Sequence, residues 1–198
     1  MIHKPFSQAC ENNKAPILQV IRTVFYQPAT VWEIGSGTGQ HACYFAEHLP
    51  HLEWQPTDRS ENIPGINLWR EEAKLVNLKP ALTLDVTDAL WPCSSIDALF
   101  TANMLHIMSW EDVQVLFNRL TEYLSPKALI CIYGPFNYNN TYTSDSNAAF
   151  DQWLRSQNIL SGIRNFEDIV SLSTSCGFSL VNDIAMPANN RLLVLQNS

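Results

Sequence analysis

Residues 33–39, Glu33-Ile-Gly-Ser-Gly-Thr-Gly39, decide the fold of this chain. The short apolar segment Thr30–Ile34 leads into this stretch and is typical of a buried strand, and the segment Gln40–Leu49 that follows has a helical pattern. Three glycines at alternate positions let the backbone turn tightly and approach a ligand closely. The following helix has unpaired N–H groups at its start. The stretch therefore predicts a ligand-binding turn between a strand and a helix.

Helical and strand patterns alternate along the rest of the chain. We expect further helices at residues 15–26, in part of 60–76, where Pro64-Gly65 breaks or delays the helix, and at 109–124, 148–157 and 165–177. Further strands are expected at residues 52–57, 81–84, 96–102, 128–133, 178–185 and 191–196. The last two have no helix between them and should pair as an antiparallel hairpin. The pattern predicts an α/β fold: a Rossmann-like, doubly wound, mostly parallel seven-stranded sheet with a C-terminal antiparallel hairpin.

The length of 198 residues fits a single domain, residues 1–198. Residues 134–147 are rich in Asn, Thr, Ser and Tyr, so we expect them to form a long loop that begins an insertion, residues 134–165, between strands five and six. The N-terminal segment, residues 1–14, has no partner strand and is predicted to fold over the site as a lid.

Composition narrows the class of partner. The formal net charge is −7 and no run of Lys or Arg occurs, which makes a duplex nucleic-acid partner improbable. We find no apolar signal core and no segment of roughly 18 apolar residues, so we expect no membrane partner. The five cysteines are far apart and odd in number, which indicates a reducing cytoplasm. We expect a small-molecule substrate and no metal; the oligomeric state is left open.

Acidic residues follow the first three strands of the predicted sheet. Glu33 precedes the first glycine, Asp58 ends the second strand, and Asp85-Val86 ends the third. Since the carboxyl ends of parallel strands meet at one edge of the sheet, these residues should surround one pocket. Asp58 could bind both hydroxyls of a ribose, and Asp85-Val86 could hold an adenine amino group. Such a pocket suits a cationic nucleoside, such as a sulfonium with an ammonium group.

The spacing of the glycines distinguishes two families of nucleotide site. A dinucleotide site has the pattern G-x-G-x-x-G, whereas this chain has E-x-G-x-G-x-G. In this respect it resembles the class I S-adenosylmethionine-dependent methyltransferases. The resemblance implies S-adenosylmethionine as cofactor and S-adenosylhomocysteine as product. The candidate cofactor-binding residues are Glu33, Gly35, Ser36, Gly37, Gly39, Asp58, Arg59, Asp85, Val86 and Asn103.

A second resemblance spans nearly the whole chain. The chain is similar to a family of predicted methyltransferases that is catalogued as a domain of unknown function. The shared features are Phe6-Ser7 with Glu11 and Asn13, Gly35–His41, Tyr133–Phe136, Ser146–Asp151, Leu154-Arg155, Gly162–Arg164 and Met186–Asn190. One departure is Asn12, where that family is expected to have Arg. If that Arg binds the cofactor carboxylate or an acidic substrate, affinity or substrate choice would differ here.

Four further residues are candidates for the reaction itself. His106 follows the fourth strand and could act as a general base, since its ordinary pKa lies near neutrality; it could equally be a structural histidine. Tyr133, Phe136 and Tyr138 follow or end the fifth strand and could shape a substrate pocket, or simply pack the loop.

The predicted function is methyl transfer to an unidentified small-molecule acceptor, which makes the chain a transferase of one-carbon groups. The acceptor would be held in line with the methyl group, and the acceptor atom stays open. One alternative is a non-catalytic sensor or scaffold that binds S-adenosylmethionine or S-adenosylhomocysteine. Another is an NAD-dependent oxidoreductase, which the glycine spacing disfavours.

Overall fold

The computed structural model of the chain describes residues 3–198. These residues group into two units, the first ending at Thr101 and the second comprising Ala102–Ser198. The prediction of a single domain over residues 1–198, and of a lid and an insertion within it, stays a prediction. Among residues 3–198, none of the helices combines the length and the apolar character that a membrane span requires.

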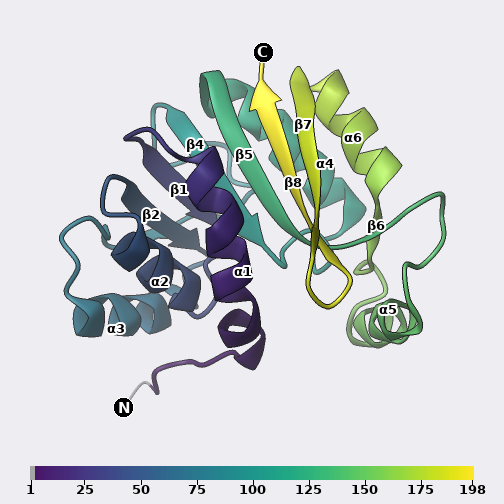
Figure 1. Cartoon of the computed structure of the whole chain (residues 1–198), viewed down its shortest axis with the longest axis horizontal. Coiled ribbons are helices and arrows are strands. Elements are labelled where there is room, and N and C mark those ends of the chain that lie inside the picture. Colours follow the sequence, from purple (N-terminus) through teal and green to yellow (C-terminus); the bar gives the residue numbers. More distant parts are fainter. Residues whose placement is uncertain (1–2) are drawn as a thin grey trace. The chain divides into compact units, whose positions relative to one another are not determined.

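The first unit contains a parallel sheet. Its strands are β1 (Thr30–Ile34), β2 (Glu53–Asp58), β3 (Leu82–Thr83) and β4 (Ile96–Ala102), and they lie in the order β3-β2-β1-β4. Figure 1 labels β1, β2 and β4. β1 is parallel to both of its neighbours, with Ile34 opposite Thr57 of β2. The strands therefore end at the same edge, which is what the sequence argument requires.

Three helices belong to the first unit: α1 (Gln8–Val24), α2 (Gln40–His48) and α3 (Ile63–Ala73). α2 packs against α1, β2 and α3, and the apolar side of α1 is buried at Ile17, Leu18 and Ile21. The glycine stretch connects β1 to α2, as predicted.

The start of α1 was predicted wrongly. Pro16 suits a first helical turn, which placed the start at residue 15, but the helix begins at Gln8 and Pro16 lies inside it. The reason is the N-cap Ser7, whose side-chain oxygen accepts a hydrogen bond from the N–H of Cys10. Most of the predicted lid, from Gln8 onward, is therefore the first part of α1.

The second unit contains the remaining strands and helices. In chain order these are α4 (Trp110–Tyr123), β5 (Leu124–Asn137), α5 (Asp145–Gln157), β6 (Arg164–Asn165), α6 (Phe166–Ser175), β7 (Phe178–Met186) and β8 (Asn190–Asn197). β8 lies between β5 and β7 and is antiparallel to both (Figure 1). The predicted terminal hairpin is confirmed. The α/β fold class is confirmed as well, with parallel strands followed by antiparallel C-terminal strands.

The strand β5 is longer than predicted. We expected it to end at residue 133, but it continues to Asn137 because Pro135 pairs with Asn190 of β8 and Phe136 pairs with Arg164 of β6. The long loop therefore starts only after Asn137. These pairings lie far apart in sequence, so the local composition of Gly134–Asn137 could not reveal them.

Candidate functional site

The glycine stretch forms a tight loop at the end of β1. Gly35, Gly37 and Gly39 all have positive φ, at 75°, 57° and 88°. The N–H groups of Gly35 and Ser36 each donate to the carbonyl of Thr57 at 3.0 Å. A Cβ at Gly39 would lie 3.0 Å from the Cα of Ile66 in α3, whereas a Cβ at Gly37 would meet nothing within 4 Å. The loop is thus closely packed at Gly39 and open at Gly37.

The structure brings Asp58 to this loop. The N–H of Gly37 donates to Oδ2 of Asp58 at 2.6 Å. The other carboxylate oxygen, Oδ1, accepts from the N–H of Arg59 and from Nδ2 of Asn62, both at 2.8 Å. Asn62 is a residue that the sequence argument missed; its position four residues after Asp58 was the available signal. The side chain of Arg59 points to solvent, where it pairs with Glu61 at 3.1 Å.

Glu33 supports the loop from inside the sheet. Its side chain is 1% exposed, and its Oε2 accepts a hydrogen bond from Nε1 of Trp54 at 2.8 Å. Burial raises the pKa of Glu33 to about 8, against the opposing effect of the Trp54 indole, and the Asp58 carboxylate adds to the rise. Glu33 is therefore largely protonated at pH 7. Ser36 lies beside it, and its Oγ accepts from the N–H of Thr57 at 3.2 Å.

Asp85 lies in a turn of its own. Its Oδ1 accepts from the N–H of Thr87 at 2.9 Å and from the Thr87 hydroxyl at 2.7 Å, and these bonds lower the pKa of Asp85. The side chain of Asp88 in turn accepts from the N–H of Asp85 at 3.2 Å. The next residue, Val86, is half-buried. A role of Asp85 and Val86 at an adenine stays a prediction, because the contacts of Asp85 are those of a turn.

In the second unit, His106 lies below the surface after β4. Its side chain is 5% exposed, and its ring meets the ring of Phe150 edge-on at 5.3 Å. A Cβ at Gly134 would lie 3.7 Å from Nδ1 of His106. Burial lowers the pKa of His106 to about 4, and the charge of Arg164 contributes to this. The imidazole is therefore neutral at pH 7. Asn103, three residues earlier, has a φ of 57° and donates its N–H to the carbonyl of Tyr133 at 2.8 Å.

Gly162 and Arg164, the first residue of β6, hold the segment around His106 in place. The N–H of Gly162 donates to the carbonyl of His106 at 2.9 Å, and Nε of Arg164 donates to the carbonyl of Leu105 at 3.1 Å. The sequence argument assigned neither residue to the site, although both belong to the stretch Gly162–Arg164 of the family resemblance.

The aromatic candidates on and after β5 are packed. Tyr133 and Phe136 are buried. The hydroxyl of Tyr138 donates to Oδ2 of Asp183 at 2.7 Å, and its ring stacks on Phe166 at 4.9 Å. The alternative of ordinary packing fits the contacts of Phe136 and Tyr138, and an acceptor-binding role for the three residues stays a prediction.

The fold is that of S-adenosylmethionine-dependent methyltransferases. The S-adenosylmethionine-dependent methyltransferase SibL in its apo form aligns at a TM-score of 0.80 and 19% identity, over 96% of this chain and 55% of SibL. An O-methyltransferase family protein from Burkholderia thailandensis gives 0.84 and 15%, over 96% and 57%. An O-methyltransferase family 2 protein from Planctomyces limnophilus, in complex with apigenin, gives 0.82 and 14%, over 96% and 60%. The chain spans little more than half the length of these proteins.

A comparison of the sequence with protein families identifies the family of this chain. The pattern of the family described as "Protein of unknown function (DUF938)" matches residues 4–197. The chain belongs to this family, and the predicted resemblance is confirmed.

Proposed function

We propose that this chain is an S-adenosylmethionine-dependent methyltransferase that acts on a small-molecule acceptor. One observation carries the proposal: a glycine loop with three left-handed residues is hydrogen-bonded, through the N–H of Gly37, to a carboxylate at the end of the neighbouring strand. The solved structures of the same fold that are named as methyltransferases support it.

The residues of the first unit fit the cofactor. The open space beside Gly37 leaves room for a ligand against the loop backbone. Asp58 offers carboxylate oxygens to the two hydroxyls of a ribose, and its bonds to Gly37 and Asn62 fix its orientation. A negative charge at Asp58 favours a cationic ligand and disfavours the pyrophosphate of a dinucleotide. We assign Gly35–Gly39 and Asp58 to cofactor binding, with Asp85, Val86 and Asn103 as further candidates.

Glu33 has a different role from the one that an exposed carboxylate would have. Its burial and its hydrogen bond from Trp54 support a role in positioning the glycine loop rather than in direct contact with the cofactor. A cation bound next to the loop would favour its ionised form. We therefore propose that Glu33 orders the glycine loop of the cofactor site.

When bound, S-adenosylmethionine supplies a methyl group on a sulfonium, whose leaving group is a neutral thioether. The chain has to hold the acceptor in line and, for a hydroxyl acceptor, to receive its proton. His106 is neutral at pH 7, so a ring nitrogen can accept a hydrogen bond from a hydroxyl. It can take the proton as the methyl group is transferred, because the alkylated hydroxyl oxygen then becomes strongly acidic. We propose His106 as this base.

The surroundings of His106 favour an acceptor with an apolar part. Phe150, which contacts His106, stacks on Trp153 at 5.8 Å, and Trp153 is 57% exposed. Such a row of rings from a buried imidazole to the surface can bind an apolar or aromatic molecule. The complex of the Planctomyces limnophilus protein with apigenin is consistent with a small-molecule acceptor.

Calorimetry with S-adenosylmethionine, S-adenosylhomocysteine and NAD tests the cofactor class. We expect binding of the first two and none of NAD. Binding of NAD alone would refute the proposal. Transfer of labelled methyl groups to small molecules of a cell extract then separates an enzyme from a cofactor sensor, since a sensor binds both sulfur compounds and transfers nothing.

The setting of the reaction is part of the same proposal. We propose a cytoplasmic protein without a nucleic-acid or membrane partner, in keeping with the charge of −7 and with five cysteines that are all free thiols. Fractionation of cells that express the tagged chain would check the compartment.

A further inference from the structure

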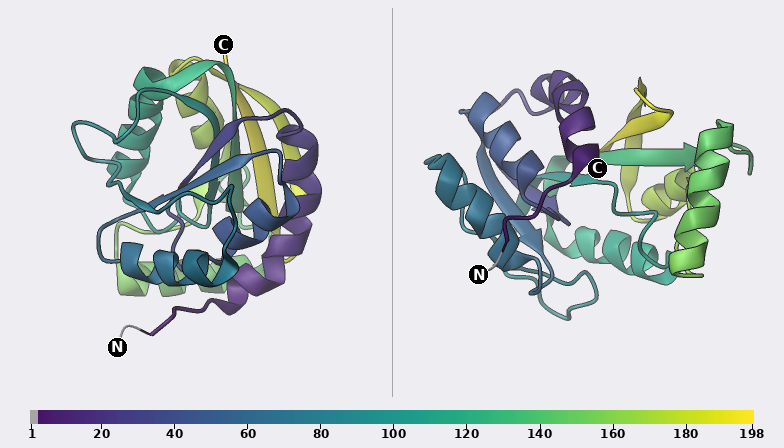
Figure 2. Two further views of the ribbon diagram at one scale, coloured as in Figure 1. Left: turned by 90° about the vertical axis from the view of Figure 1, so that its left-hand side faces the viewer. Right: turned by 90° about the horizontal axis from the view of Figure 1, so that it is seen from below.

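Residues 4–14 cross the two helices that follow the candidate cofactor residues; we call this segment the strap. Figure 2 shows its first part, in purple, running along α3 before α1 begins. α2 starts directly after the glycine loop, and α3 starts shortly after Asp58. The strap therefore connects the two helices that begin just after the candidate cofactor residues, the glycine loop and Asp58.

One end of the strap is attached to α2 through a buried amide. Gln40, the first residue of α2, accepts the N–H of Ser7 at 2.6 Å on Oε1 and donates from Nε2 to the carbonyl of Ser7 at 3.3 Å. Nε2 also donates to Oε1 of Glu11 at 2.6 Å, and the hydroxyl of Thr38 donates to Oε1 at 3.0 Å. Gln40 thus uses all its hydrogen-bonding groups to join the strap to the glycine loop.

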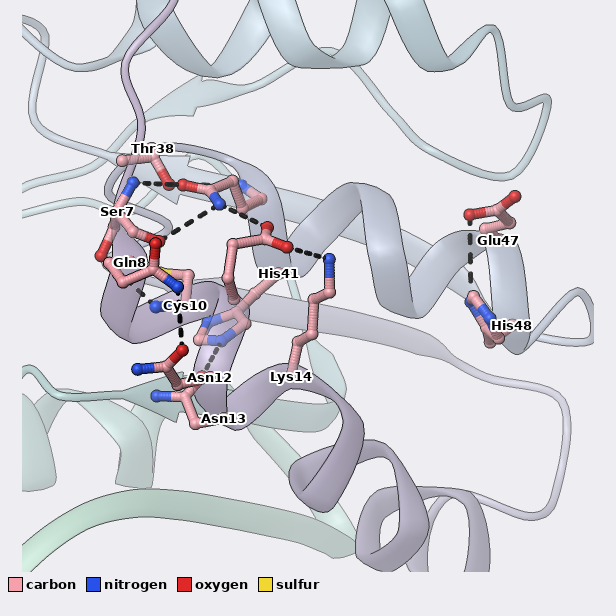
Figure 3. Close-up of polar contacts among 12 residues, drawn as sticks. Ser7, Gln8, Cys10, Asn12, Asn13, Lys14, Thr38, His41, Glu47 and His48 are labelled. Atoms are coloured by element: carbon pink, nitrogen blue, oxygen red, sulfur yellow. Dashed lines mark hydrogen bonds and ion pairs between the residues drawn. The ribbon is translucent and has the colours of Figure 1, made fainter. Parts of the chain in front are cut away.

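The next residue of α2 makes a parallel attachment. Nε2 of His41 donates to Oδ1 of Asn13 at 2.6 Å (Figure 3). Burial lowers the pKa of His41 to about 4, so its ring is neutral and can serve as a donor on this one nitrogen. Ser7, Glu11, Asn13, Gln40 and His41 belong to two separate motifs of the sequence, and the structure joins them in one group.

The other end of the strap is attached to α3. Nε1 of Trp69 donates to the carbonyl of Pro5 at 2.7 Å, and the ammonium of Lys4 lies 3.6 Å from the centre of the Trp69 ring. A Cβ at Gly65 would lie 2.7 Å from Cγ of Pro5. Gly65 is therefore the residue that lets the strap approach α3.

Between its two attachments the strap buries little apolar surface. Phe6 is 62% exposed, and a hollow of about 240 Å³ lies among residues of the strap, α2 and α3. A segment that is fixed by a few contacts at each end opens at low free-energy cost compared with the core. The hydrogen bonds that attach it to α2 and α3 lie outside the strand pairings, so breaking them leaves the pairings of the sheet intact.

We infer that the docked strap sets the spacing between the first turns of α2 and α3, which follow the glycine loop and Asp58, and that cofactor binding and strap docking strengthen each other. Gln40 is the positioning residue of this coupling. The inference rests on the proposed function, because it names what regulates the affinity of that cofactor site. Thermodynamic linkage makes the effect reciprocal. A change that releases the strap lowers the affinity for the cofactor, and bound cofactor stabilises the docked strap.

The test uses S-adenosylhomocysteine, which cannot react, as the calorimetric probe on the full chain. Gln40→Ala releases the α2 end of the strap. Gly65→Ala pushes Pro5 away at the α3 end while raising the intrinsic helix propensity of α3. Each variant should lower the affinity for S-adenosylhomocysteine by about 3- to 30-fold, the equivalent of losing one or two net hydrogen bonds. Amide exchange of residues 4–14 should slow when the probe is added to the wild-type chain, and less so in the variants.

Matched variants separate coupling from general damage. Gln40→Glu replaces Nε2, which donates to Glu11, with an oxygen, so two carboxylates face each other and the affinity for the probe should fall. Adding Glu11→Gln restores a donor at this contact, so the double variant should recover part of that affinity. Gln19→Ala, on an exposed position of α1, should change nothing. Val113→Ala, in the core of the second unit, should lower the free energy of unfolding without changing the affinity for the probe.

The possible failures can be told apart. If the wild-type chain does not bind the probe, the proposed function fails, and the inference with it. If the wild-type chain binds the probe but both Gln40→Ala and Gly65→Ala bind it within twofold, and the exchange of residues 4–14 is unchanged by the probe, only the coupling is refuted.

Discussion

Asp58 joins three donors of the chain, from Gly37, Arg59 and Asn62, on one carboxylate. Asp58→Ala should weaken the binding of S-adenosylmethionine by ~1–3 kcal/mol, because the proposed charged acceptor for the ribose hydroxyls is lost. Calorimetry measures this, with Asp145→Ala, an exposed aspartate of the second unit, as the control. A folded Asp58→Ala chain with the affinity of the wild type would reject the ribose role.

Glu33 makes stability depend on pH. Its pKa is about 8 in the folded chain, above its ordinary value, so the folded state keeps a proton that the unfolded state loses. The contribution of Glu33 to stability is therefore full below its ordinary pKa and falls as the pH rises toward 8.

Glu33→Gln removes this dependence, because the amide is neutral at every pH. The difference in Tm, variant minus wild type, should be larger at pH 8 than at pH 5 by at least about 3 °C, or roughly 1 kcal/mol at this chain length. Thermal unfolding at the two pH values measures it, and equal differences would contradict a protonated Glu33.

His106 gives a prediction about turnover. His106→Ala should lower the rate of methyl transfer to a hydroxyl acceptor by about 10²- to 10⁴-fold, the usual range for a general base, and leave cofactor affinity unchanged. Because burial lowers its pKa to about 4, the wild-type rate should show no protonation step of His106 between pH 6 and 8. An acid limb at pH 6.5 that disappears in the variant would contradict the buried, neutral imidazole.

At the level of elements, two positions of the glycine loop test packing and ligand binding separately, Gly39 for packing and Gly37 for ligand binding. Gly39→Ala places a methyl group 3.0 Å from the backbone of α3 at a positive φ, so it should cost at least about 2 kcal/mol of stability. Gly37→Ala meets nothing within 4 Å and carries only the strain of its φ, about 1 kcal/mol. Its methyl group would occupy the ligand's space, so it should lose the cofactor while staying folded. Urea unfolding and calorimetry on both variants decide this, and a Gly37→Ala chain with full affinity would place the ligand elsewhere.

The sequence predicted the elements whose signals are local. β1 matches its predicted bounds, α4 (Trp110–Tyr123) lies within one residue of the predicted helix 109–124 at both ends, and the last two strands form the predicted hairpin. The start of α1 was missed because Pro16 was placed in the first turn and the local cap Ser7 was overlooked. The end of β5 was missed because it depends on distant partners, β6 and β8.

The same division applies to the candidate site. The rule that strand ends share an edge predicted that Asp58 and the glycine loop would meet, and they do. It did not predict that Trp54 would enclose Glu33, or that Thr87 would occupy Asp85. Which partner a carboxylate takes depends on side-chain packing, which strand periodicity does not specify.

For the whole molecule, the proposed function predicts stabilisation by ligand. S-adenosylhomocysteine at 100 times its Kd should stabilise the folded chain by about 2.7 kcal/mol, which corresponds to a rise in Tm of about 5–10 °C for a chain of this length. Differential scanning fluorimetry with NAD as the control measures it. An equal rise with NAD would indicate a different class of cofactor.

The three donors on Asp58 also have an entropic consequence. A carboxylate that is free in the absence of ligand has to give up rotamer freedom when it binds, and that loss weakens the complex. Here three hydrogen bonds within the folded chain hold the Asp58 carboxylate, so in the proposed complex a ribose would meet a preorganised acceptor, and this rigidity would add to the affinity.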